Sequence, residues 1–156
     1  MMLEGGARMM WRWVRIRRGL GIVIPAIALS VSAYWSLVLH WQACVMCWSE
    51  RLLLATTLFG WTIDLPWLVA FASASGLVVS ASQWWMQLRA VHAAFCSTTA
   101  PCDVSYFQWG PFTTAGLATI VFAALTALAL DRLAHVPRQA KKMGGMLFRS
   151  EIQSGR

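Results

Sequence analysis

Residues 20–39 read LGIVIPAIALSVSAYWSLVL, twenty residues without a charged side chain. A helix rises about 1.5 Å per residue, so this segment would measure about 30 Å, the thickness of the hydrocarbon core of a bilayer. Arg17 and Arg18 precede it, and His40 and Trp41 follow it. Because the apolar run is longer than the core of a signal peptide and no A-x-A site follows it, we expect a transmembrane helix.

Charged residues lie almost entirely at the two ends of the chain. Between residues 19 and 130 the sequence holds only Glu50, Arg51, Asp64, Arg89 and Asp103. With 58% apolar and 12% charged residues, the composition is that of a membrane protein. The basic residues flank the first and last apolar segments, which predicts cytoplasmic termini and an even number of crossings by the positive-inside rule. This distribution also argues against nucleic-acid binding.

Three more apolar segments complete the predicted fold. Residues 47–63 and 66–88 are expected to form a helical hairpin that turns at Asp64, with Pro66 in the favoured first position of a helix. The hairpin is slightly short for two crossings, so its first helix is expected to begin near Cys47. The last span covers residues 112–130, where small residues favour close helix packing.

The sequence therefore predicts an all-α integral membrane protein, a four-transmembrane-helix bundle with both termini cytoplasmic. The bundle would form a single domain over residues 1–132, followed by a basic cytoplasmic tail over residues 133–156. Several tryptophans near the outer ends of the spans are expected to form an aromatic belt, and only secondarily a ligand wall. They are Trp35, Trp41, Trp48, Trp84, Trp85 and Trp109.

The four cysteines form two pairs on the predicted outer side. Cys44 and Cys47 would lie at the start of the second helix, where unpaired N–H groups and the helix dipole favour a thiolate. Arg51 follows Cys47 by one turn on the same helical face, where it can stabilise a thiolate or a reduced, anionic cofactor ring. The alternative for Arg51 is an interfacial position near the headgroups or an ion pair with Glu50.

Cys96 and Cys102 lie in the second outer loop. A bridge between them would close only a short loop and stabilise the fold modestly, so disulfide exchange explains the pair better. Neither residue lies in a long apolar run, and both are expected to be accessible to a water-soluble thiol. Two alternatives remain for the four cysteines: inert structural disulfides, and a four-sulfur metal site, against which the long spacing of the second pair and the oxidising compartment argue.

Residues 44–51, CVMCWSER, resemble the C-x-x-C-[WI]-x-[EQ]-R motif of the DsbB family of membrane thiol oxidases. Cys96-x5-Cys102, followed by Tyr106 and Trp109, is similar to the C-x5-C-x3-Y-x2-W motif of that family's short-loop, BdbC-type branch. The order of elements agrees from about residue 20 to residue 130.

The resemblance implies a multi-pass protein of the bacterial inner membrane with its cysteine loops on the periplasmic side. It would reoxidise a soluble thioredoxin-fold, DsbA-like oxidase and pass the electrons to a membrane quinone, ubiquinone or menaquinone. By motif position, the partner's thiolate would attack Cys96, the displaced Cys102 would attack Cys44, and Cys47 would donate the electrons to the quinone. Arg51 would stabilise the charge that develops on the quinone ring. No metal is implied.

The sequence departs from the family pattern in the third span. A histidine expected near its outer end is replaced by Gln83, with Gln87 one turn further along, and these residues join Arg51 as candidates for quinone binding. His92 lies beyond the span and is an unassigned candidate. A metal-handling membrane protein with cysteine ligands is the alternative function, and a structural membrane subunit with inert disulfides is a third.

Overall fold

The computed structural model describes residues 3–91, 102, 105, 107–110 and 112–154, and the side chains only between residues 13 and 134 of these ranges. Four helices make up nearly all of this part of the chain. They are α1 (Leu3–Leu37), α2 (Val45–Thr62), α3 (Pro66–Arg89) and α4 (Thr114–Ser154). A short antiparallel hairpin of β1 (Gln108–Trp109) and β2 (Phe112–Thr113) leads into α4. The four helices agree with the predicted all-helical class.

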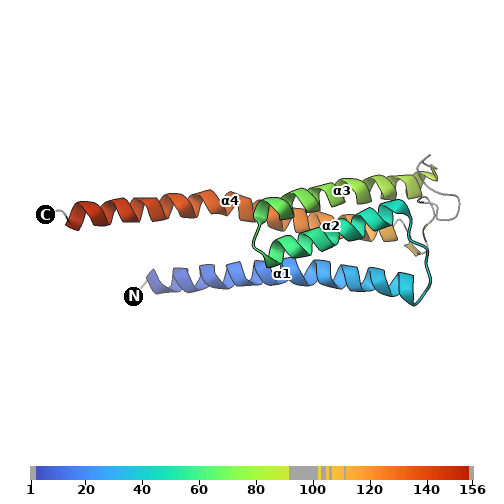
Figure 1. The fold of residues 1–156 in the computed structure, drawn as a ribbon, viewed down its shortest axis with the longest axis horizontal. Coiled ribbons are helices and arrows are strands. Elements are labelled where there is room, and N and C mark those ends of the chain that lie inside the picture. Colours follow the sequence, from blue (N-terminus) through green and yellow to red (C-terminus); the bar gives the residue numbers. More distant parts are fainter. Residues whose placement is uncertain (1–2, 92–101, 103–104, 106, 111, 155–156) are drawn as a thin grey trace.

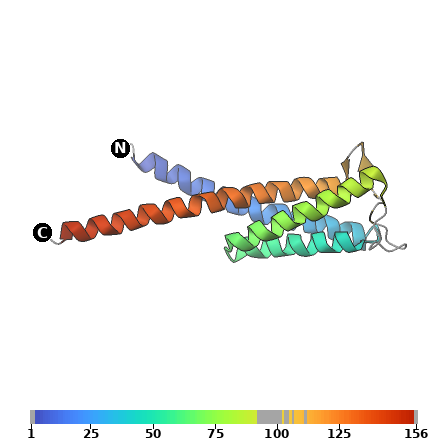
Figure 2. The same ribbon diagram turned by 90° about the horizontal axis from the view of Figure 1, so that it is seen from above.

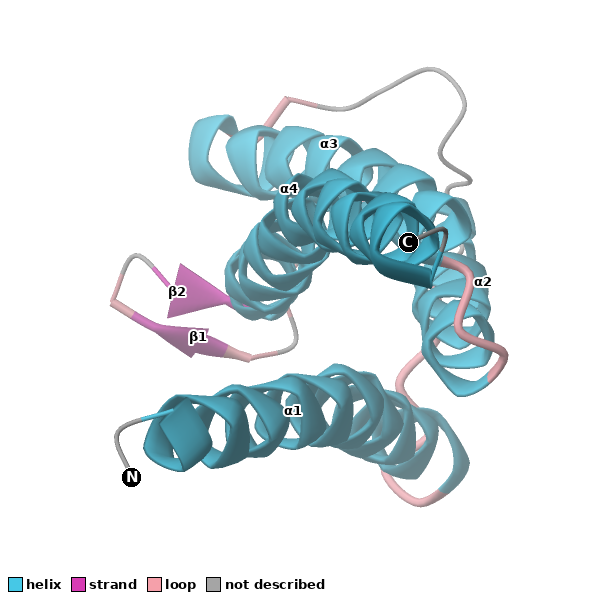
Figure 3. Cartoon of the chain, turned by 90° about the vertical axis from the view of Figure 1, so that its left-hand side faces the viewer, coloured by secondary structure: helices cyan, strands magenta, loops and turns pink. Residues whose placement is uncertain are grey.

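The helices run up and down, so that each end of the bundle collects a different set of helix ends and connections. The start of α1, the α2–α3 turn and the end of α4 point the same way, and α1 and α4 extend beyond the turn (Figures 1 and 2). The α1–α2 connection and the β hairpin lie at the opposite end. Seen along the bundle, α2, α3 and α4 pack together and α1 stands to one side (Figure 3).

Helices α1 and α4 differ most from the predicted spans. Helix α1 begins at Leu3, well before residue 20, and α4 continues to Ser154, through the segment that was predicted as a tail. The apolar stretch delimits what a bilayer can cover, whereas Arg, Lys, Met and Ala continue a helix readily beyond it. Residues 112 and 113, predicted as the start of the last span, form β2 instead.

The hairpin of α2 and α3 follows the predicted pattern. Asp64 adopts a left-handed conformation at the turn, with φ of 66°, and Leu65 N–H donates to the Gly60 carbonyl at 2.9 Å. Pro66 occupies the first turn of α3, where its missing N–H removes no helical hydrogen bond. The turn therefore lies at Asp64, as expected from the sequence.

The core is built where small residues let the helices approach closely. Phe122 of α4 is fully buried against Gly76 of α3, where an added Cβ would overlap the ring. Trp61 of α2 meets Gly21 of α1 in the same way. At this end of the bundle, Arg17 pairs with Asp131, tying α1 to α4. The packing holds the helices in one register.

The outer surfaces of the helices are apolar. Two described segments are long and apolar enough to cross a bilayer, Trp13–Leu37 and Thr114–Ala134. On α3, Trp67 and Phe71 are also largely exposed, at 74% and 73%. A surface of this kind is suited to contact with lipid rather than water.

Candidate active site

The first cysteine pair lies at the N-terminal end of α2. Cys44 caps the helix, and its Sγ accepts a hydrogen bond from the backbone N–H of Cys47 at 3.4 Å. Both residues are free thiols, with their sulfurs 3.0 Å apart. The hydrogen bond with Cys47 and the burial of the side chain raise the pKa of the Cys44 thiol. The predicted position at the start of the helix is confirmed, and Cys44 is the partner that keeps its proton.

The second cysteine pair is represented by Cys102, because Cys96 lies outside the described residues. Cys102 is disulfide-bonded and only 1% exposed, and it packs in one cluster with Cys44, which is 3% exposed. The expectation that Cys102 is accessible to a soluble thiol was therefore wrong. The residue packs against the first pair, which the lack of an apolar run around it did not reveal.

Two glutamines of α3 hold the cysteines in place. The Gln83 Nε2 donates to the sulfurs of Cys47 at 3.4 Å and Cys44 at 3.6 Å, and the residue is 2% exposed. One turn further, the Gln87 Nε2 donates to the Cys102 carbonyl at 3.4 Å. The i, i+4 spacing puts both amides on the face of α3 that meets the cysteines. These two candidates therefore contact the sulfur pair and the second loop respectively.

Arg51 links α2 to α1. Its Nε donates to the Ser32 hydroxyl at 2.8 Å, and its Nη2 donates to the Ser32 carbonyl at 3.0 Å and to the Ser36 hydroxyl. Its guanidinium also lies 5.2 Å from the centre of the Trp48 ring. The side chain is thus held within the bundle, and its hydrogen bonds go to α1.

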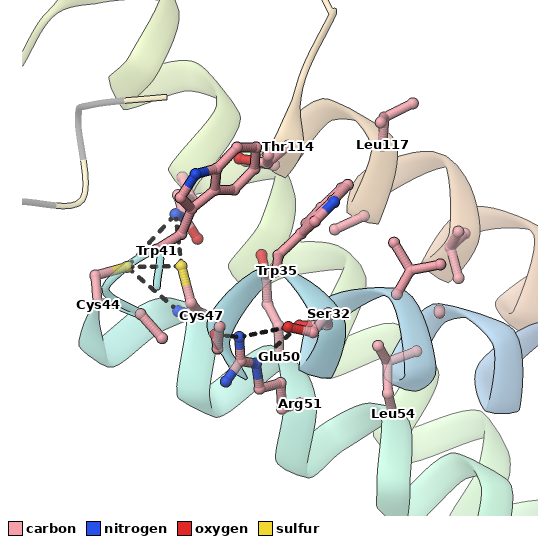
Figure 4. A pocket seen from close by; sticks show the side chains of 18 of the residues that line it. Ser32, Trp35, Trp41, Cys44, Cys47, Glu50, Arg51, Leu54, Thr114 and Leu117 are labelled. Atoms are coloured by element: carbon pink, nitrogen blue, oxygen red, sulfur yellow. Dashed lines mark hydrogen bonds between the residues drawn. The ribbon is translucent and has the colours of Figure 1, made fainter. Parts of the chain in front are cut away.

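A cavity of about 420 Å³ opens beside the cysteine pair. Figure 4 shows Cys47, Glu50 and Arg51 of α2 on one side of it, with Ser32 and Trp35 of α1 nearby. Apolar side chains of α1 and α4 form most of the remaining wall. Their members are Ile24, Ile27, Ala28, Val31, Ala115, Leu117, Ala118 and Val121. The volume lies within the range of small-molecule and cofactor sites.

Comparison with known protein families finds one match. The model of the family described as "Disulfide bond formation protein DsbB" matches residues 15–131, well over half of the chain. The chain belongs to the DsbB family. No curated protein and no solved structure matches it. The protein is accordingly a membrane disulfide-forming oxidoreductase of the DsbB family. The matched region contains both cysteine pairs, all of α2 and α3, and the parts of α1 and α4 that pack against them.

Several residues of this DsbB-family site were not identified from the sequence. Ser32 and Ser36 bind Arg51, and their i, i+4 spacing within an apolar span was the available signal. Trp35 and Trp41, assigned first to an aromatic belt, line the cavity with ring centroids 5.5 Å apart. Glu50 is buried at 8% exposure and also lines the cavity. Its position one turn after Cys47 could have indicated this.

The residues required for a metal site do not gather in the described part of this DsbB-family chain. Among the described residues, no three His, Cys, Asp or Glu side chains are placed to hold one ion. His92 lies outside the described residues, as does Cys96. The described cysteines are instead arranged as a thiol pair beside a disulfide-bonded third sulfur.

Proposed function

We propose that this protein reoxidises a soluble thioredoxin-fold, DsbA-like oxidase and passes the electrons to a membrane quinone, ubiquinone or menaquinone. It would thereby support disulfide bond formation in exported proteins. The observation that carries the proposal is the packing of Cys102 against Cys44 at the edge of the cavity. A disulfide-bonded sulfur of the second loop thus lies beside the thiol pair of the first, where a disulfide can be exchanged between loops.

The proposed electron path uses the four cysteines in sequence. The thiolate of the partner attacks Cys96 and displaces Cys102, which attacks Cys44 and breaks its disulfide with Cys47. The partner's second thiol then resolves its mixed disulfide with Cys96. The freed Cys96 thiolate attacks Cys102, re-forms the disulfide of the second loop and releases Cys44 as a thiol. The result is a reduced Cys44 and Cys47 pair with Cys102 in a disulfide, which is the state of these three residues in the structure. In this state Cys47 is ready to donate two electrons.

The cavity fits a quinone in both shape and chemistry. A bound quinone supplies an acceptor for two electrons and two protons. The apolar wall suits its ring and tail, and the Trp35 and Trp41 rings offer aromatic surfaces. Gln83 and Gln87 both line the cavity. The side-chain oxygen of each is buried and has no hydrogen-bond partner among the described residues. Arg51 lies within the same wall and would stabilise negative charge on the ring.

The proposed topology has four spans, both termini in the cytoplasm and the cysteine loops on the periplasmic side of a bacterial inner membrane. The two helix ends nearest the termini lie together, opposite the α1–α2 connection that carries Cys44 (Figure 1). Exposed apolar residues on α2 and α3, such as Leu52 and Trp67, support these helices as further spans. The spacing of Cys96 and Cys102 supports the short-loop, BdbC-type branch, with residues 133–156 as a cytoplasmic extension of the domain.

The test adds a reduced thioredoxin-fold oxidase and ubiquinone or menaquinone to the detergent-solubilised protein and follows quinone reduction. We expect catalytic turnover in the wild type and none in Cys47→Ser. Cys102→Ser should also abolish turnover, because Cys96 then forms no disulfide that the partner's thiolate can attack. Turnover that persists in Cys47→Ser would contradict the proposed path.

A further inference from the structure

Glu50 is an unused acidic group in the wall of the cavity. Of the described residues that line it, Glu50 is the only carboxylic acid. It follows Cys47 by three residues, so both side chains lie on the same face of α2 (Figure 4). The residue is 8% exposed, and its Oε1 is buried without a hydrogen-bond partner among the described residues. The exchange of disulfides assigns no role to this carboxyl group.

Arg51 does not supply a hydrogen-bond partner for Glu50 Oε1. The guanidinium of Arg51 is directed at α1, where it donates to Ser32 and Ser36. An ionised carboxylate oxygen that is buried without a donor is costly, and a carboxyl group that carries a proton avoids that cost. The other ionisable groups among the described residues of the cavity are Cys44, Cys47 and Arg51. Glu50 is therefore the carboxyl that can hold a proton next to the thiol pair.

A second observation points to the same use of the cavity. The Oε1 atoms of Gln83 and Gln87 are also buried without a partner among the described residues, and both side chains line the cavity from α3. Carboxamide and carboxyl oxygens accept hydrogen bonds. The three acceptors suit a ligand that carries O–H groups, which is the chemistry of a hydroquinone.

We propose that Glu50 holds a proton and delivers it into the cavity when the Cys44 and Cys47 thiols are oxidised. This inference rests on the proposed function. Oxidation of the two thiols forms one S–S bond and releases two electrons and two protons, which are the electrons and protons that reduction of a quinone to a hydroquinone consumes. Glu50 gives its proton to one quinone oxygen and regains one from a thiol, and the proton of the other thiol goes to the second quinone oxygen, so that no further reactant is needed.

An infrared experiment on the full-length protein, purified without added quinone, tests the proton directly. Redox difference spectra of the cysteine pair should contain the C=O band of a protonated carboxyl, which shifts in D2O. We expect this band in the wild type, its loss in Glu50→Gln, and its retention in Asp64→Asn. Asp64 offers the matched control, because it lies in the α2–α3 turn at the other end of the bundle. A band that survives in Glu50→Gln would overturn the inference, as would its absence from the wild type.

Turnover distinguishes this inference from the function on which it rests. Glu50→Gln is expected to lower kcat for quinone reduction by tenfold or more, within the range of general acid catalysis, while Glu50→Asp retains part of the activity. Single-turnover oxidation of the partner without quinone should be unchanged, which shows that the variant is folded. If the wild type does not reduce quinone, the proposed function falls. If the wild type and Glu50→Gln reduce it at equal rates, only the role of Glu50 falls.

Discussion

The contacts of Arg51 with α1 allow a quantitative prediction for Arg51→Lys. The guanidinium makes three hydrogen bonds, two to Ser32 and one to Ser36. They come from two different nitrogens of a planar fork, whereas lysine has one nitrogen on a flexible stem. We expect lysine to keep one of the three. At about 0.5 to 1.5 kcal/mol for each hydrogen bond, the two lost bonds cost about 1 to 3 kcal/mol.

The loss of these hydrogen bonds should affect the binding of quinone more than the rate of the chemical step. Lysine keeps the positive charge, so kcat should change little, while a less firmly held α1 should raise the apparent KM for quinone. A cost of about 1 kcal/mol corresponds to about a fivefold rise, and larger costs to larger rises. Arg51→Ala removes the charge as well and should lower kcat in addition. Quinone reduction at saturating reduced partner measures both constants.

Arg89 provides the matched control for Arg51. Like Arg51 it lies over a tryptophan, with its guanidinium 4.6 Å from the centre of the Trp85 ring, but it does not line the cavity. Arg89→Lys should leave KM and kcat unchanged. An unchanged KM in Arg51→Lys, or an equal rise in Arg89→Lys, would refute the argument that the link from α2 to α1 shapes the quinone site.

Two further predictions concern packing and protonation. Gly76→Ala places a Cβ against the buried ring of Phe122 and should destabilise the protein by about 1 to 3 kcal/mol in thermal unfolding, whereas Gly19→Ala, with nothing near its Cβ position, should not. Because the pKa of the Cys44 thiol is raised, its alkylation in the reduced protein should need a higher pH than the alkylation of a free cysteine needs. In Cys47→Ala the hydrogen bond is lost, and mass spectrometry should find the alkylation profile of Cys44 shifted to lower pH; an unshifted profile would refute that cause.

Local sequence signals were sufficient for the parts of the fold that local chemistry determines. A proline after an aspartate marked the α2–α3 turn, and Asp64 adopts the left-handed conformation there. The same holds for Cys44, because the start of a helix leaves unpaired N–H groups that a preceding side chain can accept. Gln83 was identified by its place relative to a family motif, and its side-chain nitrogen donates to the sulfurs of Cys44 and Cys47. Each of these features depends on a few neighbouring residues.

The features that were missed depend on how helices lie relative to one another. Whether Trp35 contacts lipid or a cavity depends on the separation of α1 from α4, and no spacing within α1 encodes that distance. The burial of Cys102 likewise depends on its packing against Cys44 at the start of α2, a contact between residues far apart in the sequence. Hydropathy reports the affinity of a segment for lipid and does not distinguish a lipid-facing surface from the wall of an apolar cavity.

The position of α1 explains why the polar groups of the site occur where they do. Figure 3 shows α1 to one side of the other three helices. It packs on Trp61 through Gly21 at one end, and a polar attachment adds to that contact at the cysteine end. In an apolar surrounding, a hydrogen bond between an arginine and serine hydroxyls is such an attachment, since its groups have no water to bind instead. Arg51 makes that attachment immediately below the cysteine pair. The residue that anchors the wall of the cavity is therefore also the positive charge within it, and the two roles can be separated only by a substitution that keeps the charge and loses the geometry.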